Sequence, residues 1–288
     1  MVVKSLTAKG ILGAIAGMAL FAGAGSAAAA AHGPKLENPG FSFQGPLGKF
    51  DRGALQRGYK VYAEVCSACH GMNLMYYRNL AQEGGPFFNE RYPNPNDSPY
   101  AKAIAAGVQV ADIDPDTGDA IDRAATPADR FRSPFPNEAA ARASNGGAFP
   151  PDLSVMAKAR AGGAAYIYSL MTGYHEAPAG LTVPPGQYYN AYMAGDLSSY
   201  WSGPKDQVPH GGFLAMPPQL TPDRVTFDDG TQATIQQQAK DVATFLAWTA
   251  EPLQEERKKT GWAVMIYLVL LAGIMWLSYR RIWKNVAH

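Results

Sequence analysis

The 288-residue sequence predicts a mainly α-helical domain with long connecting loops, followed by one C-terminal transmembrane helix. Three observations lead to this prediction. Apolar residues recur at helical spacing in residues 53–65 and again in residues 234–252. The chain also contains 30 glycines and 22 prolines, which is typical of many loops and turns between short elements. Finally, the uncharged residues 262–279 form a run that is long enough to cross a bilayer.

The first 31 residues have the composition of an export signal. Lys4 and Lys9 precede a short apolar run, and the small residues 26–31 end the segment. Basic, apolar and small residues in this order are typical of a cleavable signal peptide. We expect residues 1–31 to be removed, so that the mature protein begins near His32; an uncleaved membrane anchor is the alternative.

The C-terminal apolar run, Trp262–Tyr279, has an aromatic residue at each end, where amphipathic rings prefer the membrane interface. At about 1.5 Å per residue the run reaches roughly 27 Å, close to the thickness of a bilayer core. A buried soluble helix fits less well, because the run has no polar face. Basic residues flank both ends, so the export signal decides the topology. We expect a periplasmic domain (32–260), a transmembrane helix (261–279) and a cytoplasmic tail (280–288).

Charge is distributed unevenly along the chain. Residues 32–256 contain 17 of the 25 basic residues but all 24 acidic residues, which gives a net charge of −7. An acidic domain argues against binding to nucleic acid, and its charge serves either solubility or a basic partner. Five aspartates fall within the stretch ADIDPDTGDAIDR, which we expect to be a solvated loop. Between Gly71 and Thr221, no run of alternating apolar and polar residues predicts a strand.

The only two cysteines, Cys66 and Cys69, are three residues apart, and His70 follows the second directly. A disulfide between them would close a very small loop and would stabilise the fold little. A zinc site would need two more ligands, but His175 and His210 have no histidine neighbour at a suitable spacing. A thioredoxin-like dithiol would follow a buried strand, whereas a helical pattern precedes this pair.

The remaining interpretation of CSACH is the attachment motif of a c-type haem. Two thiols at this spacing can form thioethers with the two vinyl groups of haem, and the adjacent histidine can supply the proximal iron ligand. Leu55, Tyr59, Tyr62 and Val65 share one face of the helix that leads into the motif. In a haem domain we expect the helix within residues 234–252 to pack across this face.

A methionine as the sixth iron ligand would raise the reduction potential, whereas an open position would bind gases or peroxide. Met72 and Met75 are too close to the attachment turn to reach the opposite side of a haem. Met216 lies in PHGGFLAMPPQL, where glycines allow close approach and prolines stiffen the chain. The residues alone leave several other candidates open: Met156, Met171, Met193, His175 and His210.

Longer motifs carry a resemblance to a known family. They are QRGYKVYAEVCSACH, NGGAFPPDLSVMAKAR, YIYSLMTGY, AMPPQL and FDDGTQATIQQQAKDVATFLAWTAEP, followed by the single C-terminal span. With these motifs the chain resembles the cytochrome c1 family, the haem subunits of the cytochrome bc1 complex, over nearly its whole mature length. The resemblance implies a cytochrome c-like haem domain with one covalently bound haem c.

By this resemblance, Cys66 and Cys69 hold the haem, and His70 and Met216 are the axial iron ligands. Arg160 is expected to meet a haem propionate, which a guanidinium can neutralise through two parallel hydrogen bonds. The rest of the family's haem pocket maps onto Asn145, Ala148, Pro150, Pro151, Met156, Tyr166 and Leu170.

The function implied by the resemblance is transfer of single electrons from a Rieske iron–sulfur protein to a cytochrome c. The chain would be the electron-transfer subunit of ubiquinol:cytochrome c oxidoreductase, with cytochrome b as a further partner, in the bacterial inner membrane. The haem would supply the redox chemistry, and no side chain would make or break bonds. A membrane-anchored haem sensor or peroxidase with an open iron position is the alternative.

The chain departs from the family pattern in two places. Some bacterial members carry an insertion and a second cysteine pair before the distal methionine, and this sequence has neither. We therefore expect packing and hydrogen bonds alone to hold the loop around Met216. Asn145 is followed by Gly146 where some members have paired asparagines.

Overall fold

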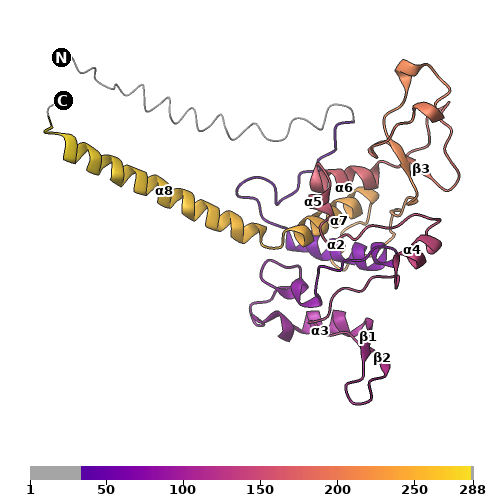
Figure 1. Cartoon of the computed structure of the whole chain (residues 1–288), viewed down its shortest axis with the longest axis horizontal. Helices are drawn as coiled ribbons and strands as arrows, with labels where there is room; N and C mark the ends of the chain where they lie inside the picture. Colours follow the sequence, from indigo (N-terminus) through magenta and orange to yellow (C-terminus); the bar gives the residue numbers. More distant parts are fainter. Residues whose placement is uncertain (1–33, 287–288) are drawn as a thin grey trace. The chain divides into compact units, whose positions relative to one another are not determined.

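The computed structural model describes residues 34–286 (Figure 1), so the expected signal peptide lies outside the described residues. The described residues up to Lys258 form one compact unit, which we call the body, and those from Lys259 onward belong to a second unit. The described part is mainly helical, as the sequence predicts. Its α-helices are α2 (Arg52–Glu64), α3 (Pro99–Ala106), α4 (Glu138–Ser144), α5 (Met156–Ala159), α6 (Gly163–Thr172), α7 (Ile235–Ala250) and α8 (Gln254–Trp283).

The centre of the body is the crossing of α2 and α7, which lie side by side in Figure 1. Gly58 allows this close approach, because a Cβ atom there would lie only 2.1 Å from the carbonyl oxygen of Asp241. The rings of Tyr59 and Tyr62 on α2 contact the ring of Phe245 on α7, with centroids 5.8 and 5.9 Å apart. The predicted packing of these two helices is confirmed.

An ion pair joins the same two helices beside the crossing. Nε of Arg57 lies 2.7 Å from Oδ2 of Asp241, whose side chain is completely buried. Gln237 donates a further hydrogen bond of 2.8 Å to this oxygen, and Arg57 reaches the more exposed Asp229 at 2.6 Å. A buried carboxylate needs such partners, because removing its charge from water is costly.

The segment before α2 runs from residue 34 to residue 50 and ties several elements of the body together. The amide nitrogen of Glu37 donates a hydrogen bond of 2.8 Å to Oγ of Ser169 on α6. The carboxylate of Glu37 also accepts a 2.9 Å hydrogen bond from the hydroxyl of Tyr192. Three buried phenylalanines of the segment belong to the main core: Phe41, Phe43 and Phe50.

Residues 111–123 are largely exposed, as expected of a solvated segment, but they belong to an antiparallel hairpin rather than to a simple loop. β1 (Gln109–Ile113) pairs with β2 (Ala120–Ala124). The five aspartates lie in the strands and at the tip of this hairpin. Arg123 holds the hairpin through ion pairs with Asp112 at 2.5 Å and Asp129 at 2.8 Å. Most of its residues are exposed, so neither face shows the apolar alternation by which strands are recognised.

Residues 174–216 form a second small feature of the body, which we call the small lobe. It has its own core of Leu181, Tyr189 and Leu197. Its strands β3 (Tyr188–Asn190) and β4 (Gly212–Leu214) pair antiparallel, so this region also departs from the strand-free expectation (Figure 1). Met216 lies two residues after β4, and the lobe therefore positions the expected distal ligand.

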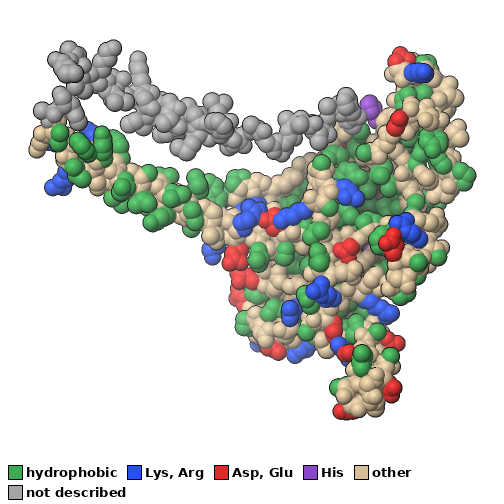
Figure 2. Space-filling view, in the orientation of Figure 1, with side chains coloured by type: hydrophobic (Ala, Val, Ile, Leu, Met, Phe, Trp, Pro, Cys, Tyr) green, Lys and Arg blue, Asp and Glu red, His purple; other side chains and the backbone are tan. Residues whose placement is uncertain are grey.

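The C-terminal helix α8 is longer than the expected span of residues 261–279. Pro252 follows the end of α7, as predicted, and α8 then begins at Gln254 because its polar first turns continue directly into the apolar run. By length and composition α8 could cross a membrane. Residues 259–286 are all exposed, and apolar side chains cover the helix in Figure 2.

Candidate functional site

Cys66, Cys69 and His70 lie on one tight turn directly after α2. The helix ends at Glu64, and a single 3₁₀ turn over Cys66–Ala68 follows. The amide nitrogens of Cys69 and His70 both donate to the carbonyl oxygen of Cys66, at 3.1 and 2.9 Å. Both thiols are free and half-buried, and burial raises the pKa of the Cys66 thiol to about 12. The turn thus presents two thiols and an imidazole within five residues.

His70 is oriented by the backbone of a distant segment. Its Nδ1 lies 2.7 Å from the carbonyl oxygen of Pro151. A carbonyl oxygen only accepts hydrogen bonds, so the proton must sit on Nδ1, and Nε2 keeps a free lone pair. Burial lowers the pKa of His70, which further favours the neutral imidazole. Histidines that ligate metals usually donate their other ring N–H in this way, so His70 is oriented to ligate through Nε2.

Three hydrogen bonds fix the carbonyl of Pro151 by joining residues 71–74 to residues 150–154. They run from Leu153 N to Gly71 O (2.9 Å), from Asn73 N to Asp152 Oδ2 (2.7 Å) and from Leu74 N to Ser154 Oγ (3.0 Å). Sequence reasoning missed Asp152 and Ser154. The only local indication of these two residues is the pattern Asp-x-Ser. In this pattern the amide of Ser154 donates a 2.9 Å hydrogen bond to the carboxylate of Asp152.

The loop that contains Asn145, Ala148 and Pro150 lies next to the attachment turn. Asn145 ends α4, donating from its side chain to the carbonyl oxygen of Ala141 at 2.7 Å and accepting from the amide of Ala148 at 3.0 Å. A cavity of about 270 Å³ separates this loop from the turn. Its lining includes Cys69, Asn73, Phe149, Pro150 and Asp152. Of the expected pocket residues, Pro150 is thus placed beside a cysteine, and Asn145 has a role in ending the helix.

Arg160 and Met156 lie at the two ends of the short helix α5. Met156 is half-buried and packs against the main core. Arg160 is exposed and donates to the neighbouring carbonyl oxygen of Ala159, at 3.1 Å. Within residues 34–286 its guanidinium forms no ion pair with a carboxylate, so its charge is available to an anionic group.

The expected pocket residues of α6 face the small lobe. The hydroxyl of Tyr166 lies 3.8 Å from the sulfur of Met193. The carbonyl oxygen of Leu170 accepts a 2.8 Å hydrogen bond from the side chain of Asn190, which is completely buried. This packing brings Met193, one of the alternative distal ligands, close to an expected pocket residue.

Met216 is half-buried, and its backbone is held by a residue that sequence reasoning missed. The hydroxyl of Tyr174, the first residue of the small lobe, donates to the carbonyl oxygen of Met216 at 3.0 Å. Met72 and Met75, by contrast, are buried within the main core. The motif YIYSLMTGY contains Tyr174, but nothing in its spacing indicates the contact with Met216.

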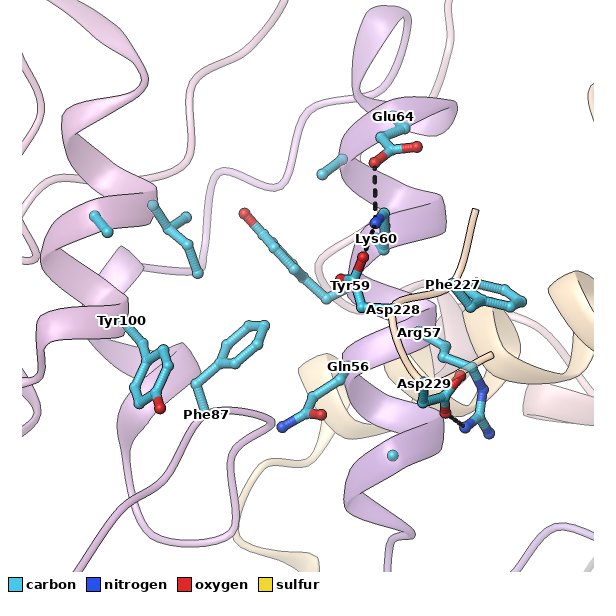
Figure 3. A pocket seen from close by; sticks show the side chains of 14 residues that line it. Gln56, Arg57, Tyr59, Lys60, Glu64, Phe87, Tyr100, Phe227, Asp228 and Asp229 are labelled. Carbon is cyan, nitrogen blue, oxygen red and sulfur yellow. Dashed lines mark hydrogen bonds and ion pairs between the residues drawn. The ribbon is translucent and has the colours of Figure 1, made fainter. Parts of the chain in front are cut away.

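The larger cavity of the body lies on a different face of α2 and contains none of the expected site residues. It measures about 360 Å³ and lies between α2, α3 and the loop at Phe227 (Figure 3). Tyr59, Phe87 and Tyr100 form its aromatic wall, and ion pairs of Lys60 with Asp228 and of Arg57 with Asp229 lie on its other side. It offers no thiol, imidazole or thioether to a cofactor.

Comparisons with known proteins identify the family of the chain. The family model described as Cytochrome C1 family matches residues 41–286. Cytochrome c1 of Rhodospirillum rubrum is 41% identical over 277 residues, which cover 95% of this chain and 96% of that protein. A mitochondrial heme protein of Arabidopsis thaliana, cytochrome c1 2, is 39% identical over 96% of this chain and 81% of its own length.

A further relative is larger than this chain. Cytochrome b/c1 of Bradyrhizobium diazoefficiens is 42% identical over 264 residues, which cover 85% of this chain. The match covers only 35% of that relative's length. The family model nevertheless spans the attachment turn, the small lobe and α8, and the Rhodospirillum rubrum relative matches over 95% of this chain. The chain therefore belongs to the cytochrome C1 family.

Proposed function

We propose that this protein is a membrane-anchored c-type cytochrome that carries single electrons from a Rieske iron–sulfur protein to a cytochrome c. The observation that carries the proposal is the attachment turn, where Cys66, Cys69 and His70 follow α2 and His70 Nδ1 meets a carbonyl oxygen at 2.7 Å. Two thiols and an imidazole with a free Nε2 are the donors that a c-type haem requires. The relatives named cytochrome c1 and cytochrome b/c1 support this assignment.

Each donor has a defined role in this proposal. Cys66 and Cys69 hold the haem through thioethers, while Nε2 of His70 and the thioether of Met216 ligate the iron. When bound, the haem supplies reversible one-electron oxidation and reduction. The chain keeps the His70 proton on Nδ1 through Pro151 and neutralises a propionate with the exposed guanidinium of Arg160. The remaining lining residues are Asn145, Ala148, Pro150, Met156, Tyr166 and Leu170.

The proposed setting is a bc1 complex in a bacterial inner membrane. The apolar helix α8 would cross the membrane, with residues 32–260 in the periplasm and residues 280–288 in the cytoplasm. Cytochrome b would be the partner within the membrane. Purification from detergent-solubilised membranes should yield this chain together with a di-haem cytochrome b and a Rieske protein, and isolation as a free-standing cytochrome would contradict the proposed complex.

The proposed attachment is tested by changing both cysteines. The double variant Cys66→Ser and Cys69→Ser should leave haem extractable by acidic organic solvent, or absent, because no thiol remains to form a thioether. Ser67→Ala is the matched control, since it changes the same turn and should leave haem covalently bound. Covalent haem in the double variant would refute the attachment.

The proposed distal ligand is tested by Met216→Leu, which keeps volume and apolar character and should preserve the fold. Loss of the thioether should lower the reduction potential and let the ferrous protein bind carbon monoxide. Met193→Leu is the control, because Met193 lies near Tyr166 and is the main alternative ligand. Carbon monoxide binding by the unmodified protein would instead favour the sensor or peroxidase with an open iron position.

A further inference from the structure

We propose that Tyr174 is the positioning residue for Met216: its hydroxyl fixes the backbone of the residue whose thioether closes the iron site. This inference rests on the proposed ligation by Met216. The O–H of Tyr174 donates to the carbonyl oxygen of Met216 at 3.0 Å. The two residues therefore meet directly, although they are 42 positions apart in the chain.

Met216 has little else to hold its backbone. β4 ends at Leu214, so Met216 lies beyond the last residue of the strand. The next two residues, Pro217 and Pro218, have no amide hydrogen and cannot donate to a neighbouring segment. Within residues 34–286, the bond from Tyr174 is the only hydrogen bond of the Met216 backbone. Its loss would therefore leave the carbonyl of Met216 without a partner in the protein.

Tyr174, by contrast, is firmly placed. It follows Gly173 at the end of α6 and forms an antiparallel bridge with Asn190. The amide of Ala191 donates to the carbonyl oxygen of Gly173 at 3.0 Å, and the buried side chain of Asn190 donates to Leu170 on α6 at 2.8 Å. The hydroxyl thus links Met216 to the same helix that carries the proposed pocket residues Tyr166 and Leu170.

The hydrogen bond from Tyr174 can explain how this chain holds the loop around Met216 without a second cysteine pair. Some family members are expected to brace this region with a second cysteine pair, and this chain has none. A hydrogen bond is reversible, and one intramolecular bond contributes about 1 kcal/mol, which corresponds to about a fivefold change in a conformational equilibrium. Removing the Tyr174 hydroxyl should therefore increase the population of the form in which Met216 is away from the iron about fivefold.

A second tyrosine of the small lobe provides a matched control. The hydroxyl of Tyr189 donates to the carbonyl oxygen of His210 at 2.6 Å, six residues before Met216. Tyr189 is buried in the core of the lobe, so Tyr189→Phe removes a comparable hydrogen bond from the same lobe. It leaves the contact between Tyr174 and Met216 intact.

The test compares Tyr174→Phe, Tyr189→Phe and Met216→Leu in the full-length, haem-loaded protein in detergent. Each is titrated with urea while two properties are followed: the near-infrared charge-transfer band of thioether-ligated ferric iron, and far-ultraviolet circular dichroism. Tyr174→Phe should lose the band at lower urea than the unmodified protein, while the circular dichroism midpoint shifts no more than in Tyr189→Phe. At a fixed carbon monoxide concentration its ferrous form should also react about fivefold faster.

The outcomes separate the two proposals. If Met216→Leu retains the band, the proposed ligation itself is wrong. If Met216→Leu loses the band but Tyr174→Phe loses it at the same urea concentration as Tyr189→Phe, ligation by Met216 stands and the positioning role of Tyr174 is refuted. Selective early loss in Tyr174→Phe supports the proposal, because a purely structural role would move both tyrosine variants alike.

Discussion

Asp241 illustrates how much the fold depends on single side chains. Its carboxylate is completely buried, and burial raises its pKa although Arg57 acts in the opposite direction. Two nitrogens of Arg57 and one of Gln237 surround the two carboxylate oxygens at 2.7 to 3.2 Å. Such a pair adds little net stability compared with apolar residues, but it is costly to break from one side.

Arg57→Met should therefore destabilise the body strongly, by about 3–5 kcal/mol, because it leaves a buried carboxylate without its cation. Unfolding by urea, followed by circular dichroism, measures this loss. Adding Asp241→Asn should restore much of the stability, since the double variant contains no unpaired buried charge. A double variant that is no more stable than Arg57→Met alone would show that the lost stability is due to packing rather than charge.

At this scale the sequence predicts the attachment turn well but not the residues that support it. Cys66, Cys69 and His70 are neighbours in the chain, so the five-residue motif CSACH is enough to predict that they act together. Asp152 contacts Asn73 across 79 positions, and Tyr174 contacts Met216 across 42. Such partners are brought together only by the tertiary fold, and no local pattern indicates them.

At the scale of elements, the body depends on the close approach of α2 and α7 at Gly58. The same helix α2 also contains Gly53 near its start, where a Cβ atom would meet only the side chains of Arg57 and Asp51, at 3.3 Å. One glycine is thus required by the packing of two backbones, whereas the other lies against flexible side chains. Substitution by alanine should therefore destabilise the body at Gly58 but not at Gly53.

Gly58→Ala should destabilise the body by about 1–3 kcal/mol or more, since the new methyl group would overlap the Asp241 carbonyl and force the helices apart. Gly53→Ala should instead be neutral or stabilise α2 by up to about 1 kcal/mol, because alanine has the higher helix propensity. Thermal unfolding of both variants measures the contrast. Equal shifts in melting temperature would mean that the crossing can relax to accept a methyl group.

The hairpin of β1 and β2 gives a prediction about pH. Hydrogen bonds from Arg123 hold the pKa of Asp129, and likewise that of Asp112, below the ordinary carboxyl range. A depressed carboxyl pKa contributes stability above the ordinary value of about 4, and this contribution is lost as the pH falls below it. Amide exchange in the hairpin, corrected for intrinsic rates, should therefore accelerate in acid before that of α2 and α7.

Asp129→Asn should produce the same loosening at neutral pH, because the amide cannot pair with the Arg123 guanidinium. Asp116→Asn, in the exposed tip, is the matched control and should leave the protection of the hairpin unchanged. If hairpin exchange is the same at pH 3 and pH 7 after correction, the ion pairs do not hold the strands together.

The elements differ in how far the sequence predicts them. α2, α7 and α8 are long and have marked apolar periodicity or an unbroken apolar run, so the sequence predicts these three helices. The hairpin is short and exposed, and its stability comes from Arg123 and from turn residues at its tip. The hairpin could have been predicted from its turn. The similar segments VADI and AIDR flank DPDTG, whose residues favour a turn, whereas burial gives no indication of these strands.

At the scale of the whole molecule, the chain divides near Lys258 rather than at the start of the apolar run. The first turn of α8 still belongs to the body: Nζ of Lys258 donates to the carbonyl oxygens of Phe43 and Gly48, at 2.6 and 3.0 Å. Glu255 also accepts a hydrogen bond from the amide of Phe50, at 2.9 Å. A soluble fragment should therefore keep these residues.

A chain that stops after Thr260 should fold and remain in the soluble fraction after cell breakage, because it retains the body and lacks the apolar run. A chain that stops after Glu251 should be less stable, since it loses the contacts of Glu255 and Lys258. Fractionation and urea unfolding compare the two. Tight membrane association of the chain ending at Thr260 would contradict a single anchor in α8.

The pairing of α2 with α7 also sets an order of events during synthesis. Arg57 and Asp241 are 184 positions apart, so the ribosome makes the two thiols and His70 long before it makes the helix that buries α2. Contacts of such long sequence separation form slowly, because a large loop must close first. Until α7 reaches α2, the helix that leads into the turn of Cys66, Cys69 and His70 lacks its main packing partner. Only a chain that already includes α7 can bury this face of α2, so the linear order of the elements delays the packing around Cys66 and Cys69 until nearly the whole body is present.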